Sequence, residues 1–88
     1  MYRIEYDRDA IKALAGMSAD QRKLIRAKVE RLTAGPHVPQ PQVKPLKGRF
    51  AGMFRLRVGD WRVLFQVDRA AAVLRVGQIK SLGGAYDD

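Results

Sequence analysis

The N-terminal segment changes from a strand-like to a helix-like pattern of apolar residues. Tyr2, Ile4 and Tyr6 alternate with polar residues, and a period of two predicts a strand with one buried face. Asp7 is a candidate N-cap for a short helix, and Gly16 lies where that helix would end. We therefore expect a strand followed directly by a short helix.

A second helix is predicted immediately afterwards. Ser18 and Gln21 form an S-x-x-Q capping box, which marks a helix N-terminus. Gly35 followed by Pro36 ends the helical pattern. An apolar stripe runs along the predicted helix and consists of Ile25, Val29 and Leu32. Because so few residues separate the two helices, they should pack as an antiparallel or angled hairpin. The basic residues of the second helix, Arg22, Lys23, Arg26 and Lys28, are expected to form a solvated face.

The next segment holds every proline of the chain, namely Pro36, Pro39, Pro41 and Pro45. Proline removes a backbone donor and blocks a helix interior. This segment is therefore expected to be a loop or an extended crossover from the helices back to the sheet.

A β-hairpin is the clearest feature of the second half. Residues 54–58 and 61–67 are strand-like, and Gly59-Asp60 between them is a two-residue turn signal. A two-residue loop fixes the register, which sets Val58 opposite Trp61, Leu56 opposite Val63, and Phe54 opposite Phe65. These pairs form one apolar face. The other face pairs Arg57 with Arg62 and Arg55 with Leu64.

A third antiparallel strand should follow this hairpin. Pairing Asp68 with Val73 places Leu74 opposite Val67 on the apolar face, and Arg75 then lies on the arginine face. A shift of one residue would bury the arginine, so the first register is preferred. Residues 79–86 are predicted to leave the sheet as a flexible tail.

Length and composition limit the possible functions. The 88 residues carry 17 Lys and Arg against 9 Asp and Glu, a net charge of +8, which favours a polyanionic partner. We expect one domain spanning residues 1–88, because a second core would be too small. Cysteine is absent and His37 is the only histidine, so thiolate metal sites and a Ser-His-Asp triad are excluded. The lack of a long apolar run or signal-like N-terminus predicts a cytoplasmic protein without a membrane segment.

The pairing of Arg57 with Arg62 is the main chemical clue. Like charges across a strand pair destabilise a sheet by about 0.2–1 kcal/mol, whereas one charge-assisted hydrogen bond to an anion contributes about 1.5–3 kcal/mol. Phosphate is the natural candidate, since guanidinium binds it through two parallel hydrogen bonds. The alternative is a solvated basic face without a ligand. Trp61 is expected to be a core or hairpin-end residue, and His37 has no partner nearby in the sequence.

Two segments carry a family resemblance. KPLKG at residues 44–48 and GMFRLRVGDWRVLF at residues 52–65 resemble the K-x-L-x-G and F-R-L-R-x-G-x-W-R-V patterns of the RelE/ParE superfamily of type II toxins. The resemblance implies an α+β fold, in which two N-terminal helices pack on one face of a small, mostly antiparallel sheet. The opposite face would then be open and would carry the arginines.

The resemblance also implies an activity. RelE-like members cut messenger RNA in the ribosomal A site, as endoribonucleases without a metal or cofactor. The catalytic residues implied by that resemblance are Arg55, Arg57, Arg62, Lys80 and Tyr86. Lys47, Arg49 and Arg75 are expected to bind nucleic acid. Arginine is too basic for an ordinary general base, so Lys80 or Tyr86 would have to assist.

Two alternatives stay open at this point. ParE-like members instead poison DNA gyrase and have no nuclease chemistry. A degenerate member would only bind an antitoxin or operator DNA. For both the RelE-like and the ParE-like activity, the resemblance implies a cognate antitoxin. Its neutralising segment should be acidic and apolar, and operator DNA would be contacted only through that antitoxin.

Overall fold

The structure is a computed structural model that describes residues 2–35 and 40–81. It contains one sheet, two α-helices and a 3₁₀ helix. The elements in chain order are β1 Arg3–Tyr6, α1 Arg8–Ala15, α2 Ala19–Leu32, β2 Val43–Pro45, η1 Gly48–Phe50, β3 Phe54–Val58, β4 Trp61–Asp68 and β5 Val73–Ser81.

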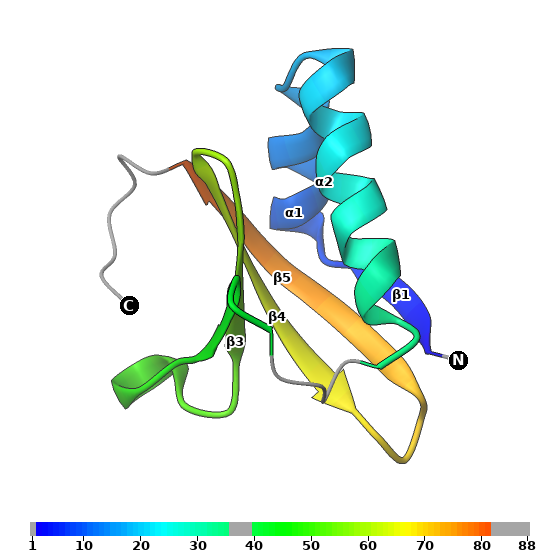
Figure 1. Cartoon of the computed structure of the whole chain (residues 1–88), viewed down its shortest axis with the longest axis vertical. Coiled ribbons are helices and arrows are strands. Elements are labelled where there is room, and N and C mark those ends of the chain that lie inside the picture. The colour runs from blue at the N-terminus through cyan, green and yellow to red at the C-terminus, as the bar shows by residue number, and fades with distance from the viewer. Residues whose placement is uncertain (1, 36–39, 82–88) are drawn as a thin grey trace.

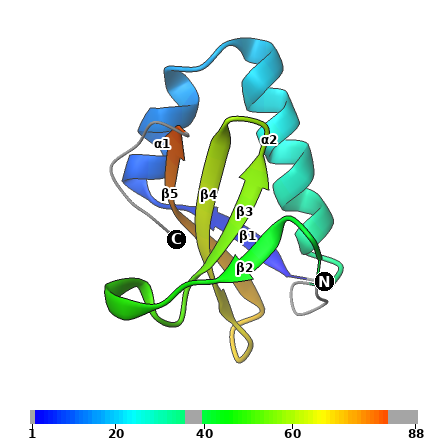
Figure 2. The same cartoon turned by 60° about the vertical axis from the view of Figure 1, so that its left-hand side comes forward.

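The five strands lie in the order β1-β5-β4-β3-β2 (Figure 2). β1 pairs with β5 in parallel, and every other pair is antiparallel. This confirms the predicted mostly antiparallel α+β sheet. β2 is an addition to the prediction, which had only an extended crossover here. Pro45 is tolerated because β2 is an edge strand, where a missing backbone donor breaks no ladder.

The predicted hairpin register is confirmed. Phe54 lies opposite Phe65, Leu56 opposite Val63, Arg57 opposite Arg62 and Val58 opposite Trp61. Gly59 in the turn has a φ of 55°, a left-handed value that a glycine adopts without steric cost. The two turn residues, Gly59 and Asp60, therefore determine which side chains of β3 and β4 lie opposite each other.

The third strand follows the predicted register at its start but continues beyond it. Asp68 pairs with Val73 and Gln66 with Arg75, as expected. A bulge opposite Leu64 and Phe65 then shifts the ladder, and β5 runs on to Ser81. The prediction of a flexible tail from residue 79 is therefore wrong for residues 79–81, and residues 82–86 lie outside the described part of the chain.

Both helices pack on one face of the sheet (Figure 1). α1 contributes Ala10 and Leu14 to the core, and α2 contributes the predicted stripe. The sheet supplies Leu56, Val58, Val63, Phe65, Leu74, Val76 and Ile79. Burying a side chain such as Phe65, which is fully buried, stabilises the fold by about 1.5–3 kcal/mol.

The junction between the helices is held by side chains. Ser18 Oγ accepts a hydrogen bond of 3.2 Å from the Gln21 backbone N–H, which confirms the predicted cap of α2. Arg22 is not part of a solvated face, because its guanidinium donates to the carbonyls of Leu14 and Met17 at 2.9 and 3.0 Å. It thereby ties the first turns of α2 to the last turn of α1 and to Met17 in the connection between the helices. Asp7 precedes α1, but its side chain makes no capping bond.

The segment between β2 and β3 folds over part of the face opposite the helices. Leu64 points to that face yet is fully buried, and Phe50 and Met53 line a cavity with it. Arg55, directly opposite Leu64, is only 6% exposed. The prediction of an open face is therefore wrong for Arg55 and holds only towards the hairpin turn.

Candidate functional site

Three cationic side chains lie in one row across the sheet. Arg57 on β3 is opposite Arg62 on β4, and Arg62 is opposite Lys80 on β5. Side chains directly opposite in a ladder have Cβ atoms about 4.5–5.5 Å apart. Arg57 is exposed, and Arg62 and Lys80 are half-buried. We call Arg57, Arg62 and Lys80 the basic row.

The bulge in β5 is what brings Lys80 into the basic row. Val76 and Ile79 both face the core, although strict alternation would put them on opposite faces. The extra residue at the bulge restores Ile79 to the core face and turns Lys80 to the face that carries Arg62. The sequence groups Lys80 with Arg57 and Arg62 but predicts it in a tail, whereas the structure places it on β5, directly opposite Arg62.

A second set of side chains lies beside the basic row. Lys44 on β2 pairs with Arg55, and Leu64 pairs with Gln78. Lys44 is exposed and adds a cation that sequence reasoning missed. The signal for it was the KPLKG segment, which reads as a strand only once its antiparallel partner β3 is known.

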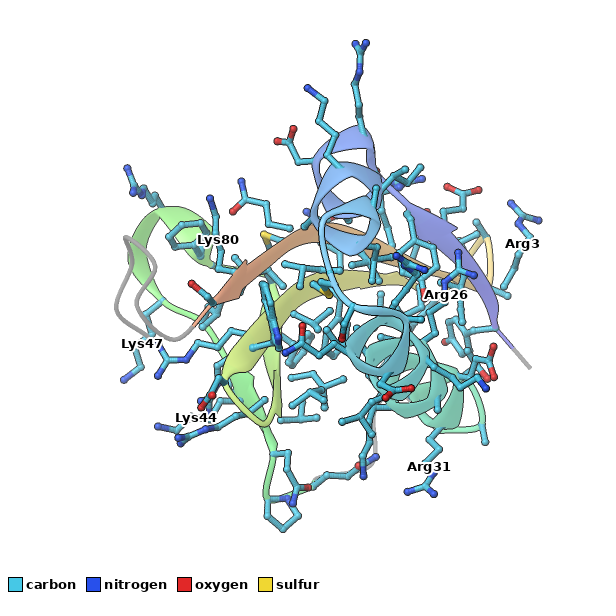
Figure 3. The ribbon with its side chains drawn as sticks, turned by 90° about the horizontal axis from the view of Figure 1, so that it is seen from above. Arg3, Arg26, Arg31, Lys44, Lys47 and Lys80 are labelled. Atoms are coloured by element: carbon cyan, nitrogen blue, oxygen red, sulfur yellow. The ribbon has the colours of Figure 1, made fainter. Side chains whose placement is uncertain are left out.

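Lys47 and Arg49, both predicted to bind nucleic acid, lie at η1 and are exposed. The Arg49 guanidinium carbon lies 5.2 Å from the centroid of the Phe50 ring, within the range of a cation–π contact. Lys44, Lys47 and Lys80 gather at one end of the molecule, away from Arg3, Arg26 and Arg31 (Figure 3). Cations from three segments are therefore brought to the same end.

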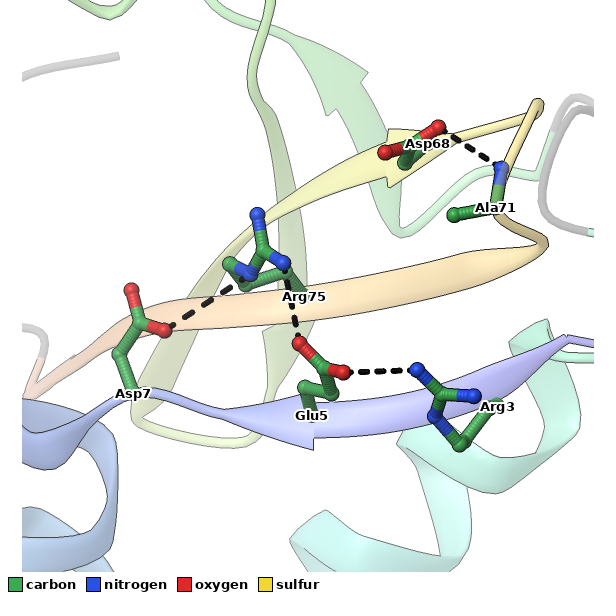
Figure 4. A network of polar contacts seen from close by, with 6 residues as sticks. All are labelled: Arg3, Glu5, Asp7, Asp68, Ala71 and Arg75. Carbon is green, nitrogen blue, oxygen red and sulfur yellow. Dashed lines mark hydrogen bonds and ion pairs between the residues drawn. The ribbon is translucent and has the colours of Figure 1, made fainter.

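Arg75 is positioned differently from the basic row. Its Nη2 lies 3.0 Å from Glu5 Oε1, and Glu5 also accepts a bond of 2.9 Å from Arg3 (Figure 4). Asp7 Oδ1 is 4.0 Å from Arg75 Nε. The hydrogen bonds from Arg3 and then Arg75 lower the pKa of Glu5, and the bond to Glu5 raises the pKa of Arg75.

The two ends of this sheet face therefore differ in charge. At the β1 end, carboxylates compensate Arg75, which weakens its predicted role as a binding cation. At the β3 end, Arg57 and Lys80 form no ion pair within residues 2–35 and 40–81. Such a surface can hold an anion, because each guanidinium or ammonium group donates charge-assisted hydrogen bonds.

Of the other residues considered in the sequence, one lies where it was expected and two lie outside the described residues. Trp61 is half-buried against the core, as expected for a hairpin-end residue. Tyr86 and His37 lie outside the described residues. Sequence reasoning missed Gln66, Gln78, Asp7 and Asp9, which line a cavity with Phe50, Met53 and Leu64.

Two further observations concern the part of the chain that the structure describes. No group of three or more His, Cys, Asp or Glu side chains there is arranged to hold a metal ion. None of its helices has the length and apolar character needed to cross a bilayer.

The sequence matches a known family over most of its length. The model of the ParE toxin of type II toxin–antitoxin systems, parDE, matches residues 3–81. No curated protein sequence matches the chain significantly.

Solved structures share the fold. The toxin–antitoxin complex RelBE2 from Mycobacterium tuberculosis contains a chain with a TM-score of 0.79 and 20% identity, covering 91% of this chain and 96% of that one. The archaeal RelE–RelB complex from Pyrococcus horikoshii contains a chain with a TM-score of 0.78 and 27% sequence identity, and the match covers 96% of this chain and 98% of that one. The YoeB/ParE toxin from Agrobacterium tumefaciens has a TM-score of 0.77 and 18% sequence identity, and the match covers 90% of this chain and 96% of that one.

Proposed function

Because the chain belongs to the ParE toxin family of type II toxin–antitoxin systems, within the RelE/ParE superfamily, we propose that it acts as a RelE-like endoribonuclease on messenger RNA at the ribosome. The observation that carries this proposal is the alignment of Arg57, Arg62 and Lys80 in one row. No metal or cofactor takes part in the proposed reaction.

The proposed chemistry needs three contributions. The 2′-hydroxyl must lose a proton, the phosphorane must be stabilised, and the leaving 5′-oxygen must gain a proton. Arg62, at the centre of the basic row, stabilises the charge on the phosphorane, and Arg57 binds a second phosphate oxygen. Arg55 contributes only its charge, because its side chain is 6% exposed.

The proton transfers fall to residues other than arginine, because a guanidinium stays charged at any working pH. Lys80 lies opposite Arg62 and is the candidate for this role within the described residues. Tyr86 is the second candidate, as the family resemblance implies.

A cognate antitoxin is the proposed protein partner. The structures from M. tuberculosis and P. horikoshii are toxin–antitoxin complexes, and this chain has a net charge of +8. An antitoxin segment that combines acidic and apolar side chains would complement this surface. Contact with operator DNA is proposed to occur only through that antitoxin.

One observation favours a second function. The matching family model is that of a ParE toxin, and ParE-like proteins are expected to poison DNA gyrase. In that case the basic row would bind gyrase or its DNA without cutting RNA. The state of transcripts and DNA in the cell distinguishes the two functions. A nuclease leaves cut transcripts, whereas a gyrase poison leaves intact transcripts and damaged DNA.

The test is induction of the Arg62→Ala variant without antitoxin. We expect the variant to lose about 100-fold in cleavage rate, the loss typical of removing one stabilising donor. Growth should then continue, and primer extension should find transcripts intact. Arg69→Ala is the matched control, because Arg69 is an exposed arginine in the β4–β5 turn, and it should stay toxic.

Three results would contradict the proposal. Cut transcripts at the parental level in cells carrying Arg62→Ala would remove the role of Arg62. Intact transcripts with DNA damage in cells carrying the parental chain would favour the gyrase function. Continued growth of cells that express the parental chain would show that the protein is not toxic and would favour a protein that only binds its antitoxin or operator DNA. Binding of Arg62→Ala to the antitoxin shows that the variant is folded.

A further inference from the structure

A cavity of about 540 Å³ lies on the same sheet face as the basic row. Its floor includes Leu64 and Gln78, which face each other across β4 and β5. Leu64 is two residues from Arg62, and Gln78 is two residues from Lys80, so both lie about 6.6 Å along their strands from the row. We call this space the Gln78 cavity.

The lining of the Gln78 cavity is mixed. Phe50 and Met53 from the β2–β3 segment and Leu64 supply apolar surface, including one aromatic ring. Gln66 and Gln78 supply side-chain amides, each of which both donates and accepts hydrogen bonds. Flat apolar walls with a few polar groups are typical of small-ligand sites.

The carboxylates determine which group can enter. Asp7 and Asp9 lie on one side of the cavity, with Arg8 between them. Carboxylates only accept hydrogen bonds, so they repel a phosphate and attract an amine. The cavity and the basic row therefore differ in preference, the row for a phosphate and the cavity for a neutral group that donates.

A nucleotide has both kinds of group at this spacing. Single-stranded nucleic acid is commonly recognised through unstacked bases that lie on aromatic side chains and form hydrogen bonds along their edges. With a phosphate on the basic row, the attached base can enter the Gln78 cavity against Phe50. Carboxylates accept from the exocyclic amine of a base, as they do from cytosine N4.

We propose that the Gln78 cavity is a base-recognition subsite that prefers a base with an exocyclic amine over uracil. This inference rests on the proposed function in one respect, since its ligand is a nucleic-acid strand held by the basic row. It adds a sequence preference that the row, which contacts phosphate alone, cannot supply.

The test measures the binding of short fluorescent 2′-O-methyl oligonucleotides of cytidine and of uridine, which cannot be cleaved. Cytosine and uracil differ at the amine position, so the ratio of their dissociation constants reports on the carboxylates. The parental chain should bind the cytidine strand about five-fold more tightly, the lower end of the range for a base contact. The D7N/D9N variant should bring the ratio to about one.

Two further variants control this test. Asp20→Asn changes an acid in the first turn of α2, as Asp9 is in the first turn of α1, and should leave the ratio unchanged. Gly77→Val fills the cavity, and a Cβ at Gly77 meets its nearest atom, Met53 Cε, at an ordinary 3.5 Å. That variant should bind both strands with the affinity of the parental chain for uridine.

The outcomes separate this inference from the proposed function. Equal affinities in the parental chain, or a ratio unchanged in both D7N/D9N and Gly77→Val, would overturn the subsite. If Arg62→Ala still weakened both strands in that case, the basic row and the proposed function would stand. If neither strand bound to the parental chain, both the subsite and the RNA-binding row would be wrong.

Discussion

At the residue scale, the ability of each cationic side chain to bind a phosphate depends on whether a carboxylate already contacts it. Arg75 gives a hydrogen bond of 3.0 Å to Glu5, so an incoming phosphate would compete with a bound carboxylate. Arg57 is exposed and has no such acid within the described residues. The two arginines on one sheet face are therefore not equivalent.

We accordingly predict different effects for two alanine variants. Arg57→Ala should weaken the binding of a short single-stranded RNA at every sequence and lower the slope of log affinity against log salt by about one unit. Arg75→Ala should change affinity and slope much less, because Glu5 already neutralises that charge. Fluorescence anisotropy over a salt series measures both, and an equal loss in the two variants would contradict the assignment.

Sequence reasoning identified the basic pair at this scale but not its surroundings. The Arg57–Arg62 pair follows from a two-residue turn, which fixes a register locally. The Glu5–Arg75 pair depends on parallel pairing between β1 and β5, elements far apart in the chain. Arg55 lies on the face opposite the helices yet is only 6% exposed, and the local alternation of residues does not predict that burial.

At the element scale, one hairpin and one bulge build the basic row. The turn at Gly59 sets Arg57 opposite Arg62, and the bulge sets Lys80 opposite Arg62. The hairpin could be predicted from the alternation of apolar and polar residues and from Gly59 in the turn. The bulge could not, because its one visible signal was Gly77 in an otherwise regular strand, and an isolated glycine does not specify a register.

The turn yields a prediction about stability. Gly59→Ala should lower the free energy of unfolding by about 1–2 kcal/mol, since an L-residue at a φ of 55° clashes with its own backbone. Gly16→Ala is the control, because Gly16 has a φ of −85° that alanine adopts freely. Urea unfolding measures both variants, and a smaller loss at Gly59 than at Gly16 would show that the turn does not need glycine.

At the scale of the whole molecule, the helices and the basic row are separated by the sheet. α1 and α2 cover one face (Figure 1), which leaves the other to a basic end, a neutralised end and the Gln78 cavity between the sheet and η1. Family resemblance and alternation predicted this layered arrangement. They did not predict its uneven charge, which arises from side chains on β1 and β2 that join the sheet at opposite edges.

The most direct test is heteronuclear NMR of the isotopically labelled chain during titration with a short 2′-O-methyl RNA. Our prediction is that the largest shift changes occur at the side-chain N–H groups of Arg57 and Arg62 and at the Lys80 ammonium, with smaller changes at Arg75. Shift changes confined to the outer faces of α1 and α2, with the basic row unchanged, would contradict it.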